Sequence, residues 1–393
     1  MTFIPAILKS GFYRTVIRLA AGMVLLICSI PLPALNVKVN LFAGQYFSAI
    51  TLSHISGKYL VKAGSVEVLA ITSGDTVTLQ KADDQIVLYC KGQMVAFGDQ
   101  FYFQGTGLDN ALAIHAGEWD TRTYEDDLSF LMYTGGIGCC NWVEIEKYIA
   151  GVVQAEAGGS SNHKVFFQVQ AIVSRTYALR MLAAYGDSVI FTDDVNNQVY
   201  KGKNEKPVIA EAVKETAGLV IVYNDSVLIN AVFHSNSGGF TLSASDVWMS
   251  SLPYLQPVVD TFSFTGKNYT WTTSIPVVQW LNYLDSRFNY PVYADSMRQL
   301  ALNFTQTERT KNFHRDIPLT AIRNDLKLRS TFFSVTSDRD QVVFTGYGYG
   351  HGVGLSQEGA IRMAELGYSS EEIIRFYYKG VRVKPYTDLP PKR

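Results

Sequence analysis

The sequence predicts an α+β fold, in which a β-rich N-terminal domain precedes a core of helices packed with β-sheet segments. Its 393 residues are 47% apolar and 18% charged, which is typical of a globular chain of two or three domains. Short alternating runs rich in Val, Ile, Tyr and Phe occupy residues 36–119 and predict strands. After residue 141, apolar residues recur at helical spacing and alternate with further strand-like runs. We therefore expect a β-rich domain over 36–140, followed by the mixed core.

The first 35 residues predict an export signal or a membrane anchor. Lys9, Arg14 and Arg18 precede the apolar run "LAAGMVLLICSIPLPAL" at 19–35. A basic stretch before roughly a dozen apolar residues is typical of a signal peptide, whereas a full membrane span needs about 20. The residues before Ala34 match a cleavage site poorly, so an uncleaved segment that associates with the membrane is an alternative. Both alternatives predict an exported protein, in the periplasm, in the cell envelope or anchored facing outward.

Charge and cysteine spacing exclude several classes of protein. The formal net charge of -1 offers no basic surface for a nucleic acid, so that class of partner is excluded. The cysteines after the leader are Cys90, Cys139 and Cys140, and they show no Cys-x-x-Cys spacing. No metal site and no cofactor are therefore predicted, and at most one disulfide, from Cys90 to one of the vicinal pair, is possible.

Two consecutive helices open the core. "VEIEKYIAGVVQAEAGG" places Ile145, Ile149 and Val152 on one helical face, and the glycines at 158–159 end that helix. "VFFQVQAIVSRTYALRMLAAYG" predicts a second helix that ends at Gly186.

The remainder of the core reads as strands and turns, with helices returning at its end. Strand-like runs occupy 189–260, and the less regular stretch 261–320 is a possible inserted subdomain. Ser356 is a candidate cap for a short helix that ends at Gly367, and "SSEE" at 369–372 predicts a capping box for the last helix.

Glu156 and Arg175 are the first candidates for chemistry. Glu156 follows Val152 by one turn, and a carboxylate that continues an apolar stripe is partly desolvated, which raises its pKa as a general acid requires. The alternative is a helix-end glutamate exposed to solvent. Arg175 lies on a row of small residues that lets the first helix approach, so we expect its guanidinium to meet Glu156. A buried ion pair that holds the two helices together is the compatible structural alternative.

Two glycine-containing segments are candidates for ligand binding. "FHSNSGGFT" at 233–241 lacks the Gly-x-Ser-x-Gly elbow of serine hydrolases, and its Ser-Gly-Gly turn is expected to present the Ser237 hydroxyl and backbone amides to a ligand. "GYGYGHGVGLSQEGA" at 346–360 sets Tyr347, Tyr349 and His351 between glycines. In an extended segment the glycine face is bare and the aromatic residues line the other face. This glycine ribbon is either the wall of a groove or a site of tight packing.

Seven segments in this order resemble the stage II sporulation protein D family, which includes the amidase enhancers and is often called SpoIID/LytB-like. They are "NWVEIEKYIAGVVQAEAG", "VQAIVSRTYAL", "NNQVYKG", "AVFHSNSGGFT", "LPYLQPVVD", "RNDLKLRSTFFSV" and "GYGYGHGVGLSQEGAIRMAELGYSSEEIIRFYYKGV". The resemblance covers about residues 141–385, which it implies are a catalytic domain. Some members bind zinc beside the histidine of the 234 segment, but no cysteine is near His234 here, so no metal is predicted.

The resemblance implies a lytic transglycosylase that acts on peptidoglycan glycan strands. The family's catalytic glutamate and arginine fall on Glu156 and Arg175. Further matching positions, together with the two tyrosines of the ribbon, are expected to bind substrate: Tyr177, Gln198, Tyr200, Ser237, Tyr347, Tyr349, His351 and Gln357.

A single carboxylate suffices for this reaction, because the 6-hydroxyl of N-acetylmuramic acid (MurNAc) attacks its own anomeric carbon and gives a 1,6-anhydro sugar. Two other functions stay open from the sequence. One is a non-catalytic glycan-binding module that enhances a cell-wall amidase. The other is a hydrolase with a second carboxylate, for which the candidates are Asp193, Asp194, Asp246 and Asp260.

Overall fold

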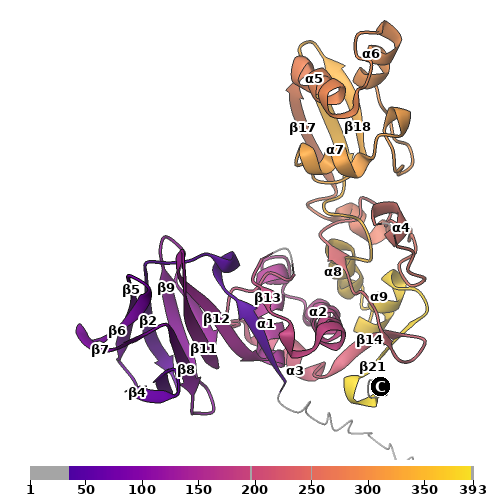
Figure 1. The fold of residues 1–393 in the computed structure, drawn as a ribbon. Coiled ribbons are helices and arrows are strands. Elements are labelled where there is room, and N and C mark those ends of the chain that lie inside the picture. Colours follow the sequence, from indigo (N-terminus) through magenta and orange to yellow (C-terminus); the bar gives the residue numbers. More distant parts are fainter. Residues whose placement is uncertain (1–34, 195–196, 249, 391–393) are drawn as a thin grey trace, which may run out of the picture. The chain divides into compact units, whose positions relative to one another are not determined.

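The computed structural model describes residues 35–194, 197–248 and 250–390. The predicted signal or anchor lies, except for its last residue, outside these described residues. Within them, no helix is both long and apolar enough to cross a membrane. The α+β class predicted from the sequence is confirmed, with strand-rich sheets first and a region of helices and further sheets after them (Figure 1).

The N-terminal part is built from two sheets. One has the strand order β13-β1-β12-β11-β8-β3-β4 and the other β10-β9-β2-β5-β6-β7. In several of these strands alternate side chains are buried, as in β5, where Val77 and Leu79 are 1% and 0% exposed. Cys90, Cys139 and Cys140 are all free thiols. The strands are β1 (Asn36–Asn40), β2 (Ala49–Ser56), β3 (Tyr59–Ala63), β4 (Val66–Ile71), β5 (Thr76–Ala82), β6 (Gln85–Cys90), β7 (Gln93–Gly98), β8 (Gln100–Gly105), β9 (Ala111–Ala116), β10 (Arg122–Glu125), β11 (Asp127–Tyr133), β12 (Gly136–Glu144) and β13 (Phe191–Thr192).

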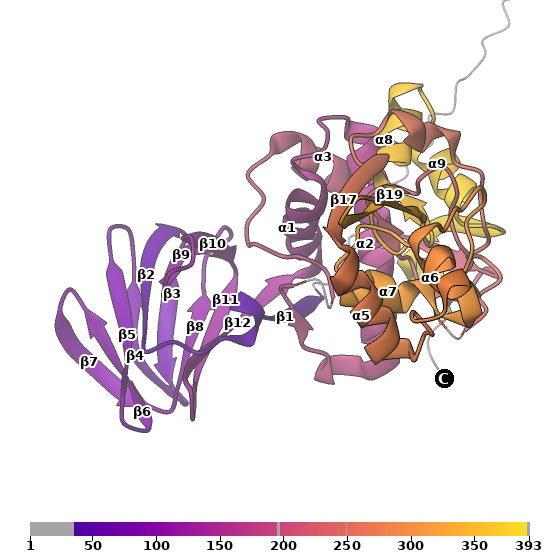
Figure 2. The same cartoon turned by 90° about the horizontal axis from the view of Figure 1, so that it is seen from above.

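The core begins where β12 ends. α1 (Ile145–Ala157) follows β12 directly, and α2 (Lys164–Tyr185) follows α1 after a short connection (Figure 2). Because β13, which comes after α2, pairs in parallel with β1, the chain returns to the first sheet before it continues. The buried side chains of this part of the chain form one hydrophobic cluster, which runs from β1 through α1 and α2 to the last helix, α9.

The predicted ends of four helices are confirmed. α1 ends before Gly158, and α2 ends at Gly186, whose φ of 66° is in the left-handed region that glycine adopts readily. Ser356 accepts a hydrogen bond from the Gly359 N–H, and Ser369 forms the predicted capping box. The other elements outside the insertion are α3 (Pro207–Glu215), β14 (Leu219–Tyr223), β15 (Val227–Leu228), β16 (Phe233–His234), α4 (Ala244–Val247), β20 (Leu355–Ser356), α8 (Gln357–Glu365), α9 (Ser370–Tyr377) and β21 (Val381–Pro385).

Residues 270–347, called the insertion below, have a sheet and a hydrophobic cluster of their own. Its sheet has the order β17-β19-β18, and fully buried Trp280 is part of the cluster, which spans 271–344. The possible inserted subdomain predicted at 261–320 begins before β17 and ends before β18 and β19, which complete the sheet. The last strand leads directly into the glycine ribbon. The elements are β17 (Thr270–Pro276), α5 (Val277–Phe288), α6 (Asp295–Leu302), α7 (Leu319–Asp325), β18 (Phe333–Asp338) and β19 (Gln341–Tyr347).

Candidate active site

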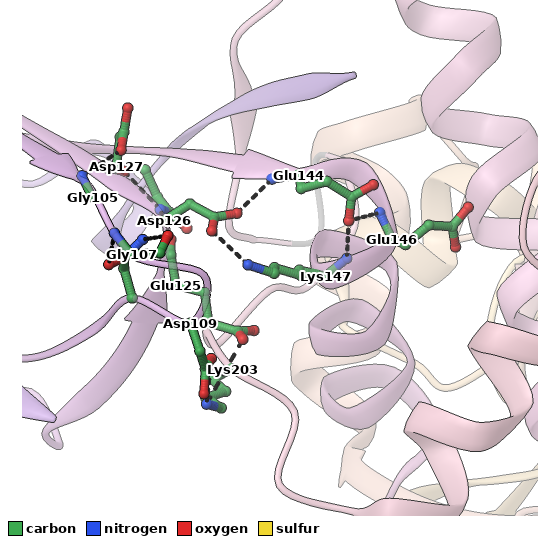
Figure 3. Close-up of polar contacts among 12 residues, drawn as sticks. Gly105, Gly107, Asp109, Glu125, Asp126, Asp127, Glu144, Glu146, Lys147 and Lys203 are labelled. Atoms are coloured by element: carbon green, nitrogen blue, oxygen red, sulfur yellow. Dashed lines mark hydrogen bonds and ion pairs between the residues drawn. The ribbon is translucent and has the colours of Figure 1, made fainter. Parts of the chain in front are cut away.

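The first turn of α1 is fixed by carboxylates (Figure 3). The Glu144 side chain caps the helix by accepting from the backbone N–H groups of Glu146 at 3.0 Å and Lys147 at 3.1 Å. Asp126, in the turn between β10 and β11, accepts from the Glu144 N–H at 2.9 Å and pairs with the Lys147 ammonium at 2.6 Å. These contacts attach the beginning of α1 to the first sheet. They therefore also help to position Glu156, which lies near the other end of the helix.

Arg175 forms an ion pair with Glu146 at the beginning of α1. Its guanidinium, whose side chain is 0% exposed, donates to the Glu146 carboxylate at 2.8 and 2.5 Å and to the Leu219 carbonyl at 3.1 Å. The predicted contact between Arg175 and Glu156 is wrong. The two glutamates are ten residues apart, or about 15 Å along the helix axis, so a guanidinium bound to Glu146 does not reach Glu156. The structure instead has the buried ion pair, with a different partner.

Glu156 is a half-buried carboxyl with one backbone donor. Its Oε1 accepts from the Val199 N–H at 2.7 Å. Burial raises the pKa of Glu156 above its ordinary value, and the Val199 hydrogen bond opposes part of that rise. The residues one and two turns earlier, Val152 and Ile149, are both 0% exposed, so Glu156 does continue an apolar stripe. The predicted direction of its pKa is confirmed.

The segment 197–199 connects Glu156 with two other predicted site residues. Asn197 donates to the Tyr177 hydroxyl at 3.2 Å, and the next two residues are Gln198 and Val199. The Gln198 side chain is 2% exposed, and neither its amide nitrogen nor its amide oxygen has a hydrogen-bond partner within the described parts of the chain. A buried primary amide without partners is costly, which distinguishes Gln198 from the other predicted site residues.

Tyr200 and Ser237 are buried, so neither side chain is presented to a ligand. Tyr200 is 1% exposed, and its hydroxyl donates to the Asn141 side-chain oxygen at 2.9 Å. Ser237 is 0% exposed, and its hydroxyl donates to the Asp260 carboxylate at 2.7 Å. The Tyr377 hydroxyl donates to the same carboxylate at 3.0 Å. The expectation of a groove-lining tyrosine and a presented serine hydroxyl is corrected accordingly.

The glycines of the ribbon face protein and not an open groove. Gly348, Gly350 and Gly354 have φ values of 80°, 115° and 70°, so the segment is not extended here. A Cβ at Gly348 would lie 2.7 Å from the Asn236 carbonyl oxygen, and one at Gly350 would lie 2.7 Å from the His234 Cβ. Tight packing, one of the two predicted alternatives, is therefore the reason for these glycines. The glycine face of the ribbon, which was expected to be bare, is covered by Asn236 and His234.

The side chains between the glycines divide into exposed and buried groups. Tyr347 and Tyr349 are 36% and 44% exposed. His351 is held by the backbone, because its Nδ1 accepts from the Val353 N–H at 3.0 Å and its Nε2 donates to the Phe233 carbonyl at 2.9 Å. Burial lowers the pKa of His351 to about 4, so its imidazole is neutral at physiological pH. His351 therefore supports the ribbon.

Gln357 and His234 complete the set of predicted positions. The Gln357 amide donates to the Gln170 side-chain oxygen of α2 at 3.3 Å, which joins α8 to that helix. His234 is 4% exposed and lies beside Asn236 and Ser237, which supply no thiolate. These residues do not fit the zinc site of some family members.

Comparisons with known proteins place this chain in a family. A sequence model described as stage II sporulation protein, SpoIID, matches residues 133–223, a stretch that includes Glu156, Arg175 and Gln198. The chain is 30% identical over 264 residues to stage II sporulation protein D of Bacillus amyloliquefaciens, covering 61% of this chain and 74% of that protein. It is 28% identical over 264 residues to stage II sporulation protein D of Bacillus subtilis (strain 168), with the same coverage. An amidase enhancer of Bacillus subtilis (strain 168) is 26% identical over 276 residues, or 56% of this chain and 39% of that protein. The chain belongs to the SpoIID family.

Proposed function

We propose that the protein is a peptidoglycan lytic transglycosylase, with Glu156 as its single general acid and base. Membership of the SpoIID family gives a role connected with the cell wall. The observation that carries the finer proposal is the state of Glu156, whose half-buried carboxyl has a raised pKa and a single hydrogen bond, from a backbone N–H, among the described residues. A carboxyl whose pKa is raised by burial keeps its proton to a higher pH than an exposed glutamate does, which is the property a general acid requires.

The reaction uses this carboxyl twice, first as an acid and then as a base. Glu156 protonates the glycosidic oxygen between MurNAc and N-acetylglucosamine, and the bond from that oxygen to C1 of MurNAc breaks with its electron pair on the departing oxygen. The resulting Glu156 carboxylate then takes the proton of the MurNAc 6-hydroxyl, whose oxygen bonds to C1. The products are a new N-acetylglucosamine end and a 1,6-anhydro-MurNAc end. No water is consumed, so no second carboxylate is required.

The other residues of the site support this reaction in different ways. We assign Gln198 to substrate binding, because the acetamido groups of both sugars offer the N–H and the carbonyl that its unpaired amide requires. Tyr177, joined to the same segment through Asn197, is assigned to the same groove. Arg175 acts at a distance, as a positioning residue that holds α1 on α2.

A hydrolase with a second carboxylate is less well supported. Each aspartate that the sequence offers for this role is bonded to other groups. Asp193 pairs with Arg122, Asp194 accepts from the Thr192 hydroxyl, Asp246 pairs with Lys311, and Asp260 accepts from Ser237 and Tyr377.

A non-catalytic module that enhances a cell-wall amidase is the second candidate, and the similarity to an amidase enhancer favours it. Mass spectrometry separates the two functions. Purified protein is incubated with glycan strands that carry stem peptides and with strands that lack them. Anhydro-MurNAc products from either substrate support the transglycosylase, whereas binding without such products from both substrates supports the module.

A further inference from the structure

Three aromatic side chains form a connected surface where the insertion meets the glycine ribbon. We call Phe264, Tyr269 and Tyr347 the aromatic surface. The ring centroids of Phe264 and Tyr269 are 5.2 Å apart, and those of Tyr269 and Tyr347 are 5.4 Å apart. Phe264 is 45% exposed and Tyr347 is 36% exposed, while Tyr269 lies half-buried between them. Large apolar groups that stay exposed side by side mark a binding surface more often than isolated ones do.

Backbone contacts fix the positions of these rings. The Gly348 N–H donates to the Tyr269 carbonyl at 2.8 Å, and the Tyr347 N–H donates to the Phe332 carbonyl at 2.8 Å. The Tyr347 ring rests on buried Phe332, with the centroids 5.3 Å apart. Phe264 lies against Gly239, where a Cβ would be 2.6 Å from its ring. Rings that are already fixed lose little conformational entropy when a ligand covers them.

The size of the aromatic surface indicates a small ligand. A fully buried aromatic side chain covers about 150–250 Å², so three rings exposed to this degree present on the order of 200–300 Å². A stable protein interface needs about 800 Å² from each partner. The surface is therefore too small to hold a protein by itself, whereas it matches a few sugar units.

The ring geometry favours a saccharide over a flat ligand. The planes of neighbouring rings are inclined by 50° and 48°, so a flat ligand cannot lie on all three. Successive sugars of a glycan are separate rings that turn relative to one another about their linkages, and the C–H face of each can lie on an aromatic face. The two tyrosines also carry hydroxyls for hydrogen bonds to the sugar edges.

We propose that the aromatic surface binds the glycan strand, at a subsite distinct from Glu156. Within the described ranges, no hydrogen bond or ring contact joins these three side chains to α1 or to the segment 197–199. The choice of a cell-wall glycan as the ligand rests on the proposed function. Because the surface and the proposed cleavage site belong to the same chain, a strand held at this surface has a raised effective concentration at the cleavage site, and we expect the surface to lower KM and to leave kcat unchanged.

Binding is tested in the full chain with Glu156→Gln, so that cleavage does not interfere. The probe is purified peptide-free glycan strands, and their dissociation constant is measured by isothermal titration calorimetry. Tyr347→Ala and Phe264→Ala are each expected to weaken binding about 3- to 10-fold, the effect of losing one aromatic contact. Tyr347→Phe keeps the ring and is expected to retain most of the affinity. Tyr293→Ala is the matched control, because Tyr293 is 87% exposed elsewhere on the insertion.

The proposal would be overturned if both alanine variants bound glycan with affinities within twofold of the Tyr293→Ala value. Their unfolding curves must match that of the parent, so that the comparison is between folded proteins. Concentration-dependent self-association that Tyr347→Ala abolishes would also overturn the proposal, because the surface would then bind a second copy of the chain. The result is independent of the proposed chemistry. Loss of binding in Tyr347→Ala, together with no cleavage by the wild type, would retain this subsite and reject the transglycosylase.

Discussion

Replacement of Arg175 by methionine tests whether this residue stabilises the helix pair or takes part in catalysis. The change removes a guanidinium that is 0% exposed and makes three hydrogen bonds. It leaves the Glu146 carboxylate with the Gly218 N–H, at 3.1 Å, as its remaining partner in that cluster. Removal of one member of a buried pair costs about 3–5 kcal/mol, and because the Glu146 side chain is 21% exposed we expect a loss near the lower end of this range. This is a large part of the roughly 5–15 kcal/mol by which a domain is usually stable.

Urea unfolding followed by circular dichroism measures this loss. Arg180→Met is the matched control, because Arg180 is exposed on the same helix and donates one bond, to the Leu228 carbonyl at 3.2 Å. In a double-mutant cycle, Arg175→Met with Glu146→Gln is expected to cost less than the sum of the single changes, by about 1–3 kcal/mol. Additive losses would show that the pair contributes no coupling.

Cleavage by the folded fraction of Arg175→Met is expected to stay within a few-fold of the wild type, because the guanidinium is about 15 Å along α1 from Glu156. A variant that unfolds like the wild type and yet cleaves glycan more than 100-fold more slowly would refute this reasoning. The guanidinium would then act on Glu156 or on the substrate, as the family resemblance implies.

Three further predictions concern the candidate site and the ribbon. Because the native pKa of Glu156 is raised above 4.5, the stability due to its proton is complete below about pH 4.5 and is lost as pH rises through the native pKa. Glu156→Gln should therefore gain stability over the wild type between pH 4 and pH 8 in urea unfolding, and a constant difference would contradict this. Gln198→Ala should leave stability unchanged or higher, because its amide is unpaired, while kcat/KM falls about tenfold or more; unchanged kcat/KM would remove Gln198 from the site. Gly348→Ala should lower the melting temperature more than Gly367→Ala, since both have positive φ but only Gly348 has a carbonyl oxygen 2.7 Å from the added Cβ, and equal shifts would contradict the packing argument.

Local patterns in the sequence predicted much of the fold. The spacing of Ile145, Ile149 and Val152 gave α1, and the same stripe gave the direction of the Glu156 pKa. Glycines and capping serines gave the helix ends. These properties depend on residues within one or two turns of one another, so a single sequence contains them.

Features that depend on distant parts of the chain were missed. Arg175 was expected to contact Glu156, the candidate general acid. In a helix pair with so short a connection, however, the middle of α2 faces the beginning of α1, where Glu146 lies. The ribbon glycines were expected to leave a bare face, yet that face is filled by the Asn236 backbone and His234, more than a hundred residues earlier. The unpaired amide of Gln198 has no sequence signal beyond its motif, because burial and the absence of partners belong to the folded state.

The most direct measurement is mass spectrometry of the products that the wild type and Glu156→Gln release from peptide-free glycan strands. The wild type is predicted to yield 1,6-anhydro-MurNAc ends, without incorporation of ¹⁸O from labelled water. Glu156→Gln keeps the size of the side chain and removes its titrating proton, so product formation is predicted to fall by about two to four orders of magnitude. Anhydro products released by Glu156→Gln as fast as by the wild type would contradict the assignment of this carboxyl as the acid, and labelled reducing ends from the wild type would contradict the transglycosylase itself.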